Sequence, residues 1–314
     1  MTGLRPRRLA FLGTPEPAAS VLRALAGKGY EVVAVVTRPD KRRGRGSALL
    51  PSPVKAAAVE LGLEPVVTHR AEDVIGSGAE LGVVVAYGRL VKPPVLAALP
   101  MVNVHFSLLP RWRGAAPVER AILAGDAETG VCLMELEEGL DTGPVLGLRR
   151  VAISGDETAA ELRAALTAEG TDLLLTELAS GLAPGRPQEG EATYAAKIDP
   201  AELHLDWSQP ALQLHRVVRV GRAWTSFRGA RLGVLRSALG AGPVEAAGSG
   251  VADGWGPAVA GASPGGLVTS RRGVAVATRE GWLSLVEVQP EGRSAMAATA
   301  WANGAHVAPG ERLV

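Results

Sequence analysis

Short apolar segments alternate with segments of helical periodicity over the first 180 residues of the chain. Apolar and β-branched runs predict strands at Arg8–Gly13, Glu31–Val36, Pro65–Val67, Leu81–Ala86, Met101–His105, Val131–Leu136 and Val145–Ile153. Helices are predicted between them at Pro15–Gly27, Pro53–Leu61, Pro117–Ala124 and Thr158–Leu182, with Thr14 as the cap of the first. The alternation predicts an α/β domain whose mostly parallel, Rossmann-like sheet carries helices on both faces.

The pattern changes after Ala183. Proline, glycine and polar residues dominate 184–206, which we interpret as an exposed linker. A helix is predicted at Pro210–Val220, and short β-like runs follow at Ala230–Arg236, Gly273–Thr278 and Trp282–Val288, with a Gly/Ala-rich segment, Gly240–Gly266, among them. Short strands at this spacing are typical of a small barrel. We therefore expect a first domain at 1–183 and a second at 207–314.

The composition is that of a globular protein. Hydrophobic residues make up 47% of the 314, which is enough for a sizeable core. Cys132 is the only cysteine and the five histidines form no close pair, so we expect no disulfide and no metal site. No apolar stretch approaches the roughly 18 residues of a membrane span, and the N-terminal run is too short for a signal peptide. We expect a cytoplasmic protein that does not enter membranes, needs no protein partner and is a monomer.

The segment Asn103–Ser107 breaks the expected pattern of a buried strand. Side chains alternate along a strand, so Asn103, His105 and Ser107 share one face, whereas a central parallel strand is ordinarily apolar on both. Ligands bind at the C-terminal edge of open α/β sheets, where these polar groups converge. On the pattern alone, a core histidine satisfied by a neighbour is an equally good interpretation.

Two loops add to this segment. After Pro110, the residues Gly114 to Ala116 leave room for close approach to the backbone, and Pro117 opens a helix. The later turn around Asp141 offers a carboxylate that can lie beside His105 and fix the orientation of its ring. Asp and Gly are also ordinary turn residues, so this turn acquires meaning only together with His105.

Taken together, Asn103–Pro117 and Gly139–Gly143 resemble the folate-dependent formyltransferases. The long match through Pro117 most resembles the branch of that family that acts on methionyl-tRNA. Further matches are Gly13–Pro15, Pro51–Lys55, Gly125–Gly130, Thr193–Ile198 and Asp206–Trp207. The resemblance is close to full length through about residue 207 and thinner beyond it.

This resemblance implies transfer of the formyl group of 10-formyltetrahydrofolate to the amino group of initiator methionyl-tRNA, for translation initiation. Asn103 and His105 would donate to the developing oxyanion, and Asp141 would hold His105 and help take the proton of the amine. The loop Ser107, Leu108, Leu109 and Pro110 would line the folate pocket. The second domain would be an OB-like barrel that binds tRNA.

Basic residues gather in two places that the resemblance connects with tRNA. Residues 38–46 contain five cations and one acid, among them Lys41, Arg42, Arg43 and Arg45. Arg216 and Arg219 recur at helical spacing in the second domain. Residues 1–200 carry 22 basic and 24 acidic side chains, and the remainder 11 and 8, so the second part is the positive one. For both clusters a solvated charged surface is the alternative.

Three departures from the family pattern stand out: Pro17, where an aromatic residue is common, Phe106 beside His105, where a small residue is frequent, and Arg219–Thr225, which lacks a Pro-Trp-Pro. Two other functions remain open. One is formyl transfer to an amino sugar or a purine precursor, and the other is non-catalytic RNA binding on this scaffold. A nucleotide-dependent dehydrogenase is disfavoured because no Gly-x-Gly-x-x-Gly follows the first strand.

Overall fold

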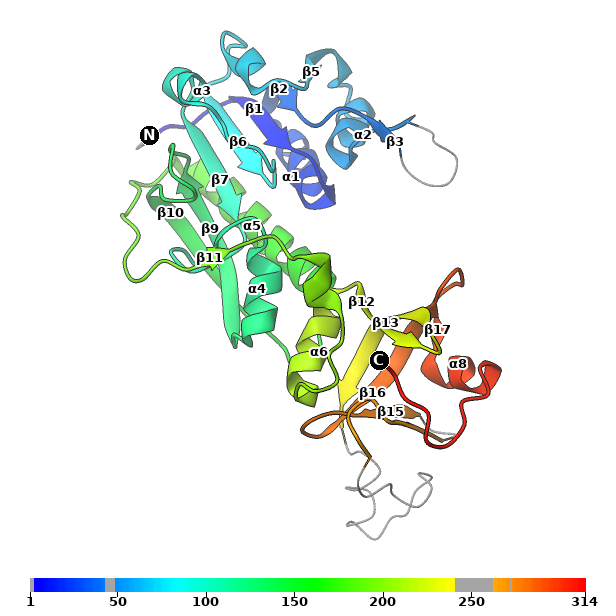
Figure 1. Cartoon of the computed structure of the whole chain (residues 1–314). Helices are drawn as coiled ribbons and strands as arrows, with labels where there is room; N and C mark the ends of the chain where they lie inside the picture. Colours follow the sequence, from blue (N-terminus) through cyan, green and yellow to red (C-terminus); the bar gives the residue numbers. More distant parts are fainter. Residues whose placement is uncertain (1–2, 43–48, 241–261, 271–272) are drawn as a thin grey trace. The chain divides into compact units, whose positions relative to one another are not determined.

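The computed structural model describes residues 3–42, 49–240, 262–270 and 273–314, which form two compact units (Figure 1). The first unit comprises the residues up to Arg120 together with Ala127–Ile153 and Leu162–Ala196. The second comprises Ala121–Asp126, Ser154–Glu161 and Lys197–Val314. The expected Gly240–Gly266 segment lies for the most part outside the described residues.

A seven-stranded sheet in the order β10-β9-β7-β6-β1-β2-β5 is the centre of the first unit. Its strands are β1 (Arg8–Gly13), β2 (Glu31–Val36), β5 (Val67–Thr68), β6 (Leu81–Val85), β7 (Met101–His105), β9 (Glu128–Glu135) and β10 (Val145–Ala152). The strands from β7 to β5 pair in parallel, and β9 and β10 run antiparallel at the other edge. This confirms the mostly parallel α/β sheet.

Helices connect these strands, at α1 (Glu16–Gly27), α2 (Pro53–Glu60), α3 (Pro93–Ala98), α4 (Pro117–Ala124) and α5 (Ala159–Ser180). Every residue of β6 is buried, as its unbroken apolar run predicts. Alternation along β7 sends Val104 toward α5, where Gly170 leaves room for it. Met101, on the other face, belongs to the apolar cluster that contains Val95 of α3.

Several local predictions were wrong. Thr14 does not cap α1: Pro15 occupies the N-cap position and makes no side-chain cap hydrogen bond. The predicted strand at Pro65–Val67 begins only at Val67, because Glu64–Val66 forms a 3-10 turn. The helix α3 was missed, since its six residues are too few to show helical periodicity.

The first half of 184–206 is largely exposed, as expected, but it is attached to the first unit. Arg186 exchanges backbone hydrogen bonds with Val145. Further on, β11 (Tyr194–Ala195) pairs in parallel with β8 (Arg113–Gly114). The segment up to Ala196 therefore belongs to the first unit and crosses the loops that follow β7 and β9.

The second unit is an antiparallel β domain. Its sheet contains β12 (Ala223–Phe227), β13 (Ala230–Leu239), β14 (Leu267–Thr269), β15 (Val274–Ala277), β16 (Trp282–Pro290) and β17 (Met296–Ala297). The helices α6 (Ala211–Val220) and α8 (Ala298–Gly304) pack on it around a core that includes Trp207, Val234 and Trp301. The short β3 (Lys41–Arg42) and β4 (Leu49–Leu50) form a separate hairpin in the first unit.

Candidate active site

The candidate site lies where β7 ends. Asn103 and His105 are two residues apart on the strand and therefore share one face of the sheet. Both are buried, with 9% and 6% of their surface exposed. The ring of Phe106, which follows His105 in the sequence, lies on the α5 side, 3.8 Å from the position that a Cβ on Gly170 would take. Phe106 is thus a core residue.

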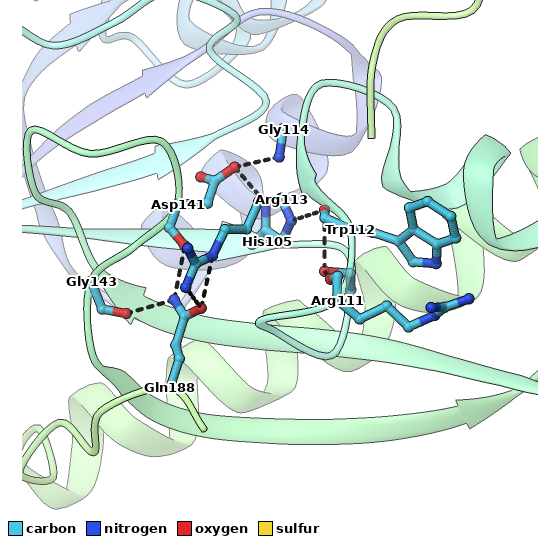
Figure 2. Close-up of polar contacts among 9 residues, drawn as sticks. His105, Arg111, Trp112, Arg113, Gly114, Asp141, Gly143 and Gln188 are labelled. Carbon is cyan, nitrogen blue, oxygen red and sulfur yellow. Dashed lines mark hydrogen bonds and ion pairs between the residues drawn. The ribbon is translucent and has the colours of Figure 1, made fainter. Parts of the chain in front are cut away.

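Both ring nitrogens of His105 lie opposite oxygen atoms (Figure 2). Nε2 is 2.9 Å from the backbone carbonyl oxygen of Trp112. Because a carbonyl only accepts, Nε2 carries the hydrogen in that bond. Nδ1 lies 3.6 Å from Oδ2 of Asp141, so a proton on Nδ1 would sit between the ring and the carboxylate.

Asp141 approaches from the turn between β9 and β10. It has a φ of +51°, a left-handed conformation that Asp tolerates better than most residues. Its Oδ2 accepts a hydrogen bond of 2.8 Å from the backbone N–H of Gly114. The structure therefore brings His105 and Asp141 together, although 36 residues separate them in the chain.

The side-chain amide of Asn103 makes no hydrogen bond to any residue within the described parts of the chain. Its backbone neighbours across the sheet are Val84 and Met134, both apolar. Asn103 keeps 9% of its surface exposed, and its amide is not among the fully buried side-chain atoms that lack a partner. An available donor two residues from His105 therefore points to a ligand oxygen at this place.

The loop after β7 is held from within. The Ser107 hydroxyl donates to the carbonyl of Arg111 at 2.6 Å, and the peptide bond between Leu109 and Pro110 is cis. The side chain of Leu108 lies against Gly130 of β9. Leu109 and Pro110 are half-buried. Ser107 and Leu108 thus shape the loop, while the other two offer apolar surface near its tip.

Two residues that sequence reasoning missed connect the loops of the site. The side chain of Gln188 contacts Arg113 and the turn of Asp141, and Thr193 Oγ1 accepts a hydrogen bond from the backbone N–H of Trp112 at 2.9 Å. Thr193 belongs to a stretch that matches the family pattern. This family match within the predicted linker was the one signal in the sequence that the segment contributes to the site.

The predicted basic residues lie in different surroundings. Lys41 and Arg42 are exposed on β3, whereas Arg43 and Arg45 lie outside the described residues. Arg216 is half-buried against Gly125.

The surroundings of Arg219 do not favour the predicted contact with tRNA. Its side chain is buried, and its guanidinium donates to the carbonyls of Glu157 and Ser154 at 2.8 and 2.7 Å. The helical spacing of Arg216 and Arg219 is real, but this face of α6 points into the second unit and not toward solvent.

Cys132 lies directly beside His105 on the neighbouring strand. Burial raises the pKa of its thiol to about 11, so the sulfur stays protonated and is no nucleophile. Within the described ranges, no group of three His, Cys, Asp or Glu side chains is arranged as a metal site. The helices of those ranges are too short or too polar to cross a membrane.

Gly114→Ala tests the junction between the loop and β11. Gly114 has a φ of +116°, and an added Cβ would lie 3.0 Å from the carbonyl oxygen of Ala195. Since both the backbone conformation and the space disfavour a side chain, we expect a loss of about 1–3 kcal/mol of stability. Urea denaturation measures it, with Gly27→Ala, where nothing lies within 4 Å of the added Cβ, as control. Equal stability of the two variants would contradict the geometry.

Comparison with known proteins identifies the family of this chain. Residues 7–178 match the family model described as formyl transferase, and residues 197–306 match that of the formyl transferase C-terminal domain. A protein named methionyl-tRNA formyltransferase from Symbiobacterium thermophilum is 43% identical over 98% of this chain and 95% of its own. Its namesake from Methylobacterium sp. strain 4-46 is 44% identical over 98% and 99%.

Among solved structures, HypX from Aquifex aeolicus in complex with tetrahydrofolic acid has a similar fold. The TM-score is 0.64 at 15% identity, and the match covers 98% of this chain and about half, 49%, of HypX. The full-length sequence matches and the two family models together show that this chain belongs to the formyl transferase family.

Proposed function

We propose that this protein transfers the formyl group of 10-formyltetrahydrofolate to the amino group of methionine on initiator tRNA. The proposal is carried by the unbonded amide of Asn103 next to the pair of buried His105 and half-buried Asp141. Relatives that carry the name methionyl-tRNA formyltransferase and match nearly the whole chain support the substrate.

The residues at the end of β7 fit such a reaction. The folate would supply an activated formyl group, and the half-buried Leu109 and Pro110 offer apolar surface for its rings. Asn103 can donate to the formyl oxygen as negative charge grows there, the role of an oxyanion-hole donor. HypX was crystallised with tetrahydrofolic acid, which supports a folate in this fold.

Asp141 and His105 together provide a proton acceptor. An amine that attacks a formyl carbon must lose a proton, and the His105–Asp141 pair at 3.6 Å can take it at Nδ1 or at the carboxylate. The carbonyl of Trp112 holds the opposite nitrogen of the ring, so the ring cannot turn away from Asp141 without losing that bond. In this scheme Asn103 stabilises the developing charge, and the His105–Asp141 pair accepts the proton.

The preferred amine substrate distinguishes this function from formyl transfer to an amino sugar or a purine precursor. We expect initiator methionyl-tRNA to be formylated faster than a nucleotide-linked amino sugar or glycinamide ribonucleotide, because relatives named methionyl-tRNA formyltransferase match 98% of this chain. Radiolabelled formyl donor and competing acceptors measure the preference. Faster turnover of either small amine would overturn the assignment of substrate.

The basic residues of the segment 38–46 provide a further test, of tRNA binding. Replacing Lys41, Arg42, Arg43 and Arg45 by Ala should weaken tRNA binding and make its salt dependence shallower, since each lost phosphate contact lowers the slope of log K against log salt by roughly 0.7–0.9. Filter binding at several salt concentrations measures the slope. Lys28→Ala, an exposed lysine elsewhere in the same unit, is the control. A slope equal to that of the wild type would show that the loop does not contact tRNA.

A further inference from the structure

The side chain of Gln188 stands between two loops of the candidate site (Figure 2). Its Oε1 accepts two hydrogen bonds from the Arg113 guanidinium, at 3.1 and 2.6 Å. Its Nε2 donates to the backbone carbonyls of Asp141 and Gly143, at 2.8 and 2.9 Å. A guanidinium can only donate and a carbonyl can only accept, so these partners also fix which end of the amide is oxygen.

We propose that Gln188 is a positioning residue that holds the Asp141 carboxylate against His105. This inference rests on the proposed function. The turn from Glu137 to Leu140 is exposed, so these residues contribute little packing next to Asp141. Three hydrogen bonds reach the turn from other loops: one from Gly114 to the Asp141 carboxylate and two from Gln188 to the backbone carbonyls of Asp141 and Gly143.

Gln188 also ties the turn to the loop after β7. Arg113 and Gly114 are adjacent in this loop. The guanidinium of Arg113 donates to Oε1 of Gln188, and the backbone N–H of Gly114 donates to the Asp141 carboxylate. The same crossing segment fixes His105 from its other side, because Thr193 holds the Trp112 backbone whose carbonyl accepts from Nε2. The segment from Arg186 to Ala195 thus acts as a strap across the site.

An amide is the one side chain of this length that serves both partners. A glutamate would still accept from Arg113, but it would face the carbonyls of Asp141 and Gly143 without a hydrogen to donate. It would also bring a negative charge close to the Asp141 carboxylate. Gln188→Glu therefore removes the two hydrogen bonds to the turn and keeps those from Arg113.

The test measures steady-state formylation of methionyl-tRNA by the full chain with Gln188→Ala and Gln188→Glu. A displaced catalytic group costs up to about 10²-fold, so we expect kcat to fall roughly 10–100-fold in both variants, with KM for each substrate within about threefold of wild type. Glu189→Ala, an exposed neighbour in the same strap, should keep wild-type kcat. An unchanged kcat in both Gln188 variants, even with lowered melting temperature, would overturn the proposal.

A second readout does not depend on turnover. The Gly114 amide donates to the Asp141 carboxylate, so its hydrogen exchange, followed by NMR, reports whether that carboxylate is in place. We expect exchange at Gly114 to rise at least about tenfold in Gln188→Ala and in Gln188→Glu, and not in Glu189→Ala. Continued protection of Gly114 in both would refute the positioning role, even if the wild type failed to formylate methionyl-tRNA and the proposed function itself were wrong.

Discussion

Asp141→Asn is expected to lower kcat for formyl transfer by roughly 10²–10⁴-fold, the range typical of a lost general base. The amide keeps the size of the side chain and can still accept from Gly114, but it cannot take a proton from the amine. His105→Ala should be at least as severe, because it removes the other half of the pair. Single-turnover formylation with saturating substrates gives the rates directly.

Both variants should bind methionyl-tRNA with wild-type affinity, since His105 is buried, Asp141 is half-buried and the pair acts on the reacting atoms. Asp172→Asn, in which an exposed aspartate paired with Arg149 is changed, is the matched control and should leave kcat unchanged. Near-normal turnover in Asp141→Asn or in His105→Ala would remove the pair from the mechanism.

Asn103→Ala is expected to reduce kcat by about 10²–10³-fold, the usual cost of one oxyanion donor. Folding should suffer little, because the Asn103 amide has no hydrogen-bond partner among the described residues and its removal leaves no other group unpaired. KM for the tRNA should stay close to wild type, since the donor acts mainly as charge develops.

The chain contains one other asparagine, Asn303, which is exposed at the end of α8. Asn303→Ala therefore serves as control for the assay and for protein quality. A loss of less than about threefold in Asn103→Ala would mean that oxyanion stabilisation comes from elsewhere in the site.

The sequence predicted the framework of the fold well where single elements have a strong pattern. The strand β6 was identified from its unbroken apolar run, and the polar residues at the end of β7 were identified from alternation alone. Asp141 was placed beside His105 only by analogy, because their separation along the chain gives no local signal of contact. The structure places Oδ2 of Asp141 3.6 Å from Nδ1 of His105.

What could not be predicted depends on partners that are distant in sequence. Proline and glycine around Gln188 indicate a linker locally, but the segment is held by β8 and by the turn of Asp141. The spacing that suggested a basic face at Arg216 and Arg219 is equally compatible with a buried face. Arg219 lies on a buried face, where its guanidinium donates to the carbonyls of Ser154 and Glu157.

The most direct measurement is formation of N-formylmethionine on tRNA. The purified protein is mixed with 10-formyltetrahydrofolate and charged initiator methionyl-tRNA, the ester bond is hydrolysed, and the released amino acid is identified by mass spectrometry. We predict formylmethionine with the charged tRNA and no formylated product with uncharged tRNA. Methionine that stays unmodified under conditions in which a known methionyl-tRNA formyltransferase converts it would contradict the assignment.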